Sequence, residues 1–310
     1  MQADTDAILK RSELEGPVMV ARIATRQTQL RGGLATLAAL GLGLALSGCD
    51  TVGASRGGLT GSAPQIAEVA PDDPAAASAN IGSLTEVINR NPGSAEAYLT
   101  RGNAYARNGR MGEAIADFSQ AIKLDGNNAA AYSNRGLAQR QLGRNDAALA
   151  DFTRALEINP RYASAYLGRA NLLRAQGQLD QAMSDLDQAI RLNPEGAQAF
   201  HARGLIYQKR GEHQRAVTDF DNAIDRDPFA GAPYQARGES LIALGKYDKA
   251  IEDFNATLNV DNKNANGWAG LGMAYEKQGN RAKASESYQR ALVIDPNNPV
   301  ARSGASRIKV

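Results

Sequence analysis

Hydrophobic and small residues recur along most of this chain with a period of 34 residues. The repetition runs from 95 to 298 without insertion and divides this stretch into six blocks. Within a block, the large apolar positions fall three to four residues apart in two segments, which is the spacing of helices that bury one face. The pattern therefore predicts six helix pairs stacked as a solenoid. The blocks begin at Ala95, Ala129, Ala163, Ala197, Gly231 and Ala265.

Four block positions keep one kind of side chain throughout. Position 4 is aromatic, positions 8 and 20 are Gly or Ala, and position 24 is aromatic or Leu. Large side chains at positions 4 and 24 fill the space between two antiparallel helices, and small ones let the backbones approach. The residues at position 24 are Phe118, Phe152, Leu186, Phe220, Phe254 and Tyr288.

The ends of the two helices in each block are also marked. Glycine stands at position 15 in all six blocks, where the first helix is expected to end in a left-handed residue. Asp146, Asp180 and Asp248 are expected to be N-caps of the second helix. Proline at position 32 in four blocks is expected to end that helix.

These residues at these spacings resemble the tetratricopeptide repeat (TPR) family over 95–298, two thirds of the chain. The resemblance implies an all-α fold, a right-handed TPR superhelix (α-solenoid) of six helix-turn-helix repeats. Residues 81–94 are expected to form a preceding half-repeat helix, with Leu84, Val87 and Ile88 as its apolar side. Residues 299–310 are expected to form a polar-faced capping helix at the other end.

Arginine at position 7 accompanies aspartate at position 23 in the first five blocks. In the sixth block both change together, to Leu271 and Ser287. We expect each arginine to pair with an aspartate of its own repeat or of a neighbouring one. A charged ladder for a ligand is the less favoured interpretation. The pairs are Arg101 with Asp117, Arg135 with Asp151, Arg169 with Asp185, Arg203 with Asp219, and Arg237 with Asp253.

The family resemblance implies a concave groove, lined by the first helices, that binds a protein or peptide partner. The bases Arg107, Arg140, Arg174, Lys209 and Lys277 stand at its rim, which favours an acidic or C-terminal segment as the ligand. The expected lining residues are Leu99, Asn103, Asn134, Leu137, Leu167, Asn171, His201, Leu205, Gln235, Glu239 and Met273.

Two details of the groove stay open at this stage. The asparagines Asn103, Asn134 and Asn171 either contact the ligand or bond neighbouring helices and water. In chaperone-binding members of the family, two amides and two cations hold a C-terminal carboxylate. Asn103 and Asn134 match the amides here, but Leu99, Ser164 and Gly168 stand where the cations belong, so that clamp is not intact.

An apolar run near the N-terminus ends at the single cysteine of the chain. Leu34 to Leu46 is built of Leu, Ala, Gly and one Thr, it follows three arginines, and Leu46-Ser47-Gly48-Cys49 closes it. This order is typical of a secretory signal. The run spans roughly 20 Å as a helix, short of the ~30 Å of a bilayer core. It resembles the lipobox of bacterial lipoproteins, which implies lipid attachment at Cys49.

The N-terminal region is divided accordingly. Residues 19–48 are assigned as a lipoprotein signal peptide, and 1–18 lie upstream of the true start if Met19 is that start. Residues 49–80 are predicted to be a flexible Gly/Ala/Ser/Pro linker. The alternative interpretation is a short buried or re-entrant apolar helix with an incidental cysteine.

Composition removes several classes of function. The chain carries 35 basic and 33 acidic residues, so no strong field is present to recruit nucleic acid. One cysteine excludes a disulfide framework. His201 and His213 have no Cys or carboxylate at ligand spacing, so we expect no metal, no cofactor, no small-molecule substrate and no catalytic site.

Together these features predict a non-enzymatic adaptor, lipid-anchored in a bacterial cell envelope and facing the periplasm. Such a scaffold would recruit cell-wall enzymes. The first alternative is a lipoprotein that assembles a pilus or secretin, and the second is a cytosolic TPR interaction protein that starts at Met1.

Overall fold

The computed structural model describes residues 74–308, and this part of the chain is all helical. The signal region, Cys49 and most of the expected linker lie outside the described residues. The helices are α1 (Pro74–Arg90), α2 (Ala95–Arg107), α3 (Met111–Leu124), α4 (Ala129–Gln141), α5 (Asn145–Ile158), α6 (Ala163–Ala175), α7 (Leu179–Leu192), α8 (Ala197–Lys209), α9 (His213–Arg226), α10 (Gly231–Ala243), α11 (Tyr247–Val260), α12 (Ala265–Gln278), α13 (Arg281–Ile294) and α14 (Pro299–Ile308).

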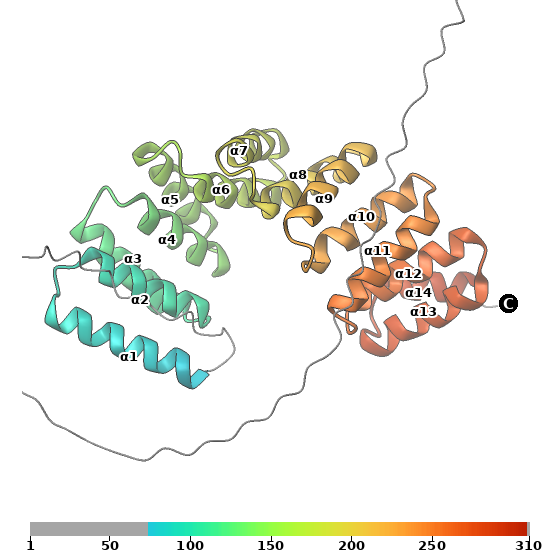
Figure 1. Cartoon of the computed structure of the whole chain (residues 1–310), viewed down its shortest axis with the longest axis horizontal. Coiled ribbons are helices and arrows are strands. Elements are labelled where there is room, and N and C mark those ends of the chain that lie inside the picture. The colour runs from blue at the N-terminus through green and yellow to red at the C-terminus, as the bar shows by residue number, and fades with distance from the viewer. Residues whose placement is uncertain (1–73, 309–310) are drawn as a thin grey trace, which may run out of the picture. The chain divides into compact units, whose positions relative to one another are not determined.

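The helices form the predicted solenoid of six pairs, α2–α3 to α12–α13 (Figure 1). We call the even-numbered member of each pair the first helix and the odd-numbered member the second helix. Each first helix contacts the first helix of the next repeat, whereas successive second helices do not contact one another. The first helices therefore lie closer together and form the inner, concave face.

A fully buried side chain at position 24 holds the two helices of each repeat together. Phe118, Phe152, Leu186, Phe220, Phe254 and Tyr288 are all 0% exposed. In five of the six repeats, glycine at position 8 of the first helix lies against an aromatic ring at position 24, and a Cβ added at Gly102 would stand 2.6 Å from Phe118 Cε1. The small residue is thus required by the distance between the helices, as the sequence predicts.

The turn inside each repeat confirms one prediction and corrects another. The six position-15 glycines have φ between 71° and 88°, the left-handed conformation that favours glycine. The aspartates are not N-caps: Asp146, Asp180 and Asp248 lie one residue inside their helices, after Asn145, Leu179 and Tyr247. If these aspartates were N-caps, each helix would begin at the following residue. Because the glycine turn is short, each helix begins two residues earlier than that. In the first turn their charge still favours the helix dipole.

The two ends of the solenoid differ in part from the prediction. Helix α1 begins at Pro74, inside the expected linker, and ends at Arg90 rather than 94. Ile88 is buried as expected, but Val87 is 48% exposed. At the other end, α14 covers the last pair through Ala301 and Gly304, with Asn298 as its buried N-cap donating to Asn266.

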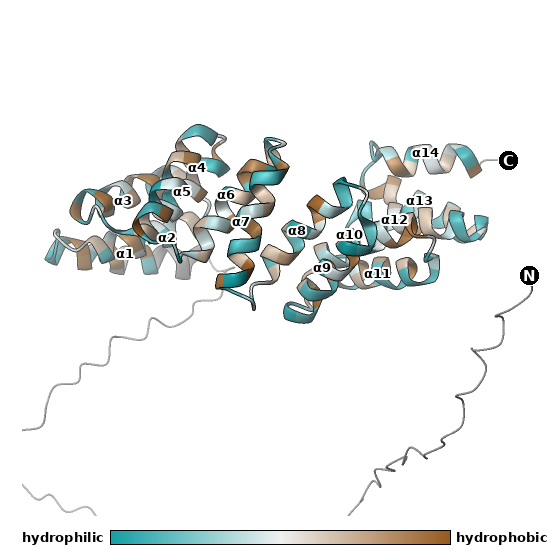
Figure 2. Cartoon of the chain, turned by 90° about the horizontal axis from the view of Figure 1, so that it is seen from above, coloured by the Kyte–Doolittle hydropathy of each residue, from teal (hydrophilic) through white to brown (hydrophobic). Residues whose placement is uncertain are grey.

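Each helix carries both hydrophilic and hydrophobic residues (Figure 2). Between residues 74 and 308, no helix is long and apolar enough to span a bilayer.

Candidate partner-binding groove

In each of the first five repeats, the arginine pairs with the aspartate of its own repeat. This is one of the two arrangements that the sequence predicts. Nε and Nη2 of Arg135, for example, each donate to Asp151 at 2.8 Å. The five aspartate side chains are only 4–8% exposed. The same arginines lie over the position-4 rings, with 5.6–5.8 Å from Cζ to the ring centroid. These pairs set the packing of α2–α11 and point away from the groove.

Sequence reasoning missed a third partner of these arginines. Nη1 of Arg101, Arg135, Arg203 and Arg237 donates to the position-25 residue of the preceding repeat or half repeat. The signal was visible, because position 25 is Thr85, Ser119, Thr153, Asp187 and Asp221 in succession. Each bond links a repeat to the one before it.

At the N-terminal end of the concave face, two asparagines bond each other. Asn134 Nδ2 on α4 donates to Asn103 Oδ1 on α2 at 2.8 Å. These two amides thus link neighbouring first helices, and their contact with a ligand stays a prediction. Ser133 beside them is fully buried, and its Oγ has no partner among the described residues.

The middle of the concave face carries a cluster of three bases, Arg140 on α4, Arg174 on α6 and His201 on α8. Burial, and then the charge of Arg174, lower the pKa of Arg140 and the pKa of His201. Arg174 Nε is buried without a hydrogen-bond partner, and no acid among the described residues pairs with Arg140 or Arg174. We call these three residues the basic cluster. An anion bound there would offset the repulsion between the positive charges of Arg140 and Arg174.

A small pocket lies between the N-terminal ends of α6 and α8, whereas Arg174 lies at the C-terminal end of α6. Its volume is about 300 Å³, and Ser164, Leu167, Gln198 and Asp227 are among its lining residues. Leu167 and Arg174 are seven residues apart on α6, so they share one face about 10 Å apart. Leu167 in the pocket and Arg174 in the basic cluster are therefore separated by the length of three residues of an extended peptide.

Two acids on the first helices, Glu239 and Glu276, have partners inside the fold. Glu239 accepts from Gln235 at 3.1 Å, and Glu276 accepts from Arg307 and from the Tyr288 hydroxyl. The Arg307 guanidinium lowers the pKa of Glu276. Arg140 and Arg174, by contrast, have no acid partner among the described residues.

The expected lining residues are distributed unequally over this face. Leu99 is 8% exposed and belongs to the core with Phe118 and Ala131, so its assignment to the groove surface is wrong. Its side chain packs among residues of α3 and α4. The other ten are half-buried or exposed on the first helices: Asn103, Asn134, Leu137, Leu167, Asn171, His201, Leu205, Gln235, Glu239 and Met273.

Within the described part of the chain, no three His, Cys, Asp or Glu side chains gather as a metal site would require.

Comparison with known proteins identifies the family. Family models described as TPR repeat match residues 102–143, 170–211 and 238–279. Models described as tetratricopeptide repeat match 129–162, 152–183, 197–229 and 265–298. Together the matches cover more than half of the chain, which belongs to the tetratricopeptide repeat family. Proteins of this fold typically act as non-catalytic scaffolds that bind other proteins. No curated protein matches the chain.

Several solved structures share the fold at low identity. The APC/C hetero-tetramer Cut9-Hcn1 has a TM-score of 0.67 at 21% identity over 75% of this chain, which spans about half, 47%, of that chain. PilW, a widely conserved type IV pilus biogenesis factor, has a TM-score of 0.61 at 19% identity, with 67% of this chain and 97% of PilW covered. YrrB, a TPR protein with an unusual peptide-binding site, has a TM-score of 0.52 at 24% identity, with 61% of this chain and 97% of YrrB covered.

Proposed function

We propose that this protein is a membrane-tethered scaffold whose concave groove holds an acidic segment of a protein partner. The basic cluster carries the proposal, because Arg140 lies near enough to Arg174 for the charge of Arg174 to lower its pKa, and neither arginine has an acid partner among the described residues. The pocket at Leu167 would take an apolar side chain of the same segment. This arrangement selects a ligand without performing chemistry on it.

The test uses two labelled peptides, Glu-Glu-Leu-Glu-Glu and its glutamine counterpart, measured by fluorescence anisotropy with the full chain. We expect the acidic peptide to bind more tightly. Arg140→Gln with Arg174→Gln should weaken it by about 1 to 2 kcal/mol in total, a factor of about 5 to 30.

The control for that variant has the same change in net charge outside the groove. Arg154→Gln with Arg191→Gln alters two exposed arginines of the second helices α5 and α7. Its affinity should equal that of the unaltered protein. Equal binding of both peptides, or equal loss in both double variants, would contradict an acid-selective groove.

The tether and the location are the second part of the proposal. The lipobox-like sequence at Cys49 supports export, lipid attachment and a position facing the periplasm. A periplasmic TPR scaffold on the membrane suits the recruitment of cell-wall enzymes. The likeness to PilW favours, as second candidate, a role in pilus or secretin assembly.

Mass spectrometry of the protein from membranes of its own host tests the tether. We expect an N-terminal peptide that begins at Cys49 and carries acyl chains. An unmodified peptide that begins at Met1 would instead support the cytosolic interaction protein and eliminate both envelope roles.

A further inference from the structure

The outer side of the solenoid has one arginine that lacks a contact made by its four equivalents. Nη1 of each equivalent donates to position 25 of the preceding second helix. Thr85 and Ser119 accept through a hydroxyl at 3.1 Å, and Asp187 and Asp221 through a carboxylate at 2.8 and 2.6 Å. A hydrogen-bond acceptor beside this nitrogen is therefore the rule in this chain.

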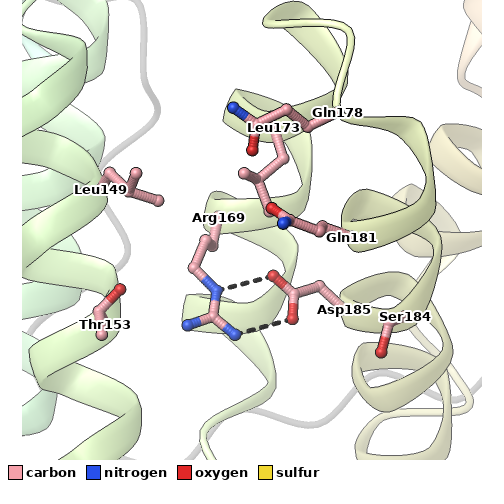
Figure 3. Close-up of a pocket in the computed structure, with 8 residues that line it drawn as sticks. All are labelled: Leu149, Thr153, Arg169, Leu173, Gln178, Gln181, Ser184 and Asp185. Carbon is pink, nitrogen blue, oxygen red and sulfur yellow. Dashed lines mark hydrogen bonds and ion pairs between the residues drawn. The ribbon is translucent and has the colours of Figure 1, made fainter.

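Arg169 is the exception. Its Nε and Nη2 donate to Asp185 at 2.7 and 2.8 Å, but Nη1 has no acceptor among the described residues. The residue at position 25 of the preceding repeat is Thr153 on α5. Figure 3 shows Nη1 of Arg169 directed toward the side of α5 where Thr153 lies, across an open gap.

A pocket of about 430 Å³ occupies this gap, which we call the outer crevice. Its walls come from α5, α6 and α7 (Figure 3). Leu149 and Leu173 give it an apolar side. Its polar lining consists of Thr153, Gln178, Gln181, Ser184 and the Arg169–Asp185 pair.

The outer crevice opens on a different face from the groove. Arg169 is two residues from Leu167 and from Asn171 on α6, which places it about 160° around the helix from each. Its side walls, α5 and α7, are second helices, which do not contact each other. A ligand in the outer crevice would leave the basic cluster free.

We propose that the outer crevice is a second binding site, which takes a carboxylate side chain of a protein partner onto Nη1 of Arg169. The next two repeats show the contact that we expect, because Asp187 and Asp221 each place a carboxylate on the equivalent arginine nitrogen. Leu149 and Leu173 would contact an apolar neighbour of the acid. The amides of Gln178 and Gln181 are placed to bond the partner's backbone.

Arg169 is held ready for such a contact. The bidentate bond to Asp185 fixes the guanidinium plane, and Tyr166 lies 5.8 Å below it. The arginine side chain is 23% exposed and lines the pocket that a partner would enter. A charge-assisted bond made by a positioned arginine loses little side-chain entropy.

The test is a titration of the full-length chain, labelled with ¹⁵N-arginine, with the peptide acetyl-Leu-Glu-Leu-amide. We expect a saturable shift of the Arg169 Nε–H signal, assigned by its loss in Arg169→Lys. The glutamine peptide acetyl-Leu-Gln-Leu-amide should bind about two- to five-fold more weakly at this site, as for an exposed ion pair.

Two aspartate substitutions form the matched pair. Thr153→Asp gives the second repeat the residue of the third and fourth, so its carboxylate should occupy Nη1 and abolish the response. Ser119→Asp adds the same charge where Arg135 already has an acceptor, and should keep the response. A response that persists in Thr153→Asp, equal shifts with both peptides, or no shift with either would overturn the proposal.

The groove variant separates this site from the first one. Arg140→Gln with Arg174→Gln should leave the Arg169 response unchanged, whether or not the groove binds acidic peptides. Loss of the response in that variant would show that the outer crevice is not an independent site.

Discussion

Replacing Arg135 by leucine is expected to destabilise the solenoid by about 3 kcal/mol or somewhat more. The substitution leaves the Asp151 carboxylate in a place where its side chain is 7% exposed, without the two bonds from Nε and Nη2. A buried charge that loses its partner costs far more than the pair contributed. Urea unfolding followed by circular dichroism would measure the change in midpoint.

The sixth repeat supplies the compensating substitution. Leu271 and Ser287 occupy the two positions there, both buried, and Ser287 Oγ donates to the carbonyl of Lys283 at 2.8 Å. Arg135→Leu combined with Asp151→Ser should therefore recover most of the lost stability. If the double variant were no more stable than Arg135→Leu, the loss of stability would come from losing the Arg–Asp pair itself. It would not come from leaving the Asp151 carboxylate buried without a partner. Hydrogen exchange would locate the change, because repeats unfold partly independently.

Gly270→Ala is expected to destabilise the protein by about 1 to 3 kcal/mol, although alanine is the better helix former. An added Cβ would stand 2.3 Å from Cε1 and 2.5 Å from Cζ of Phe254, a ring with no exposed surface. Because Phe254 fills the space between α11 and the helices on either side, the ring has no room to move. Thermal unfolding of both proteins measures the loss.

The matched control is Gly112→Ala in α3. An added Cβ there meets no atom within 4 Å, so the substitution should stabilise by about 0.4 to 1 kcal/mol through the unfolded chain. If both variants shifted the unfolding temperature in the same direction, the contact with Phe254 would not be the cause. The comparison separates close packing from helix propensity.

The repeating part of this fold was predictable because each structural role recurs. A ring at position 24, glycine at position 15 and the Arg–Asp pair each occur five or six times, so the internal comparison replaces an alignment. The start of α1 at Pro74 was missed because it occurs once, in a segment whose composition resembles a linker. The N-cap prediction was wrong because the length of the glycine turn depends on how the two helices pack. The residue type at one position does not show this.

The site was predictable only in outline. The basic rim is visible in the sequence, but which bases lack an acid depends on neighbouring helices: Glu276 meets Arg307 only through the last helix, and Arg174 has no such partner. Leu99 follows the groove period yet belongs to the core. The outer crevice lies where Nη1 of Arg169 has no acceptor. A missing hydrogen bond of this kind is recognised only from the positions of the atoms.

The bonds from Nη1 also determine how the stack responds to bending. At four of the five joints that carry an arginine, the bond ties a repeat to the one before it; at the joint between the second and third repeats, no such bond restrains Thr153 and Arg169. This joint therefore has one side-chain restraint fewer than its four equivalents. Arg140 and Arg174 lie on its two sides, and flexing there changes the separation of the two charges that face the partner.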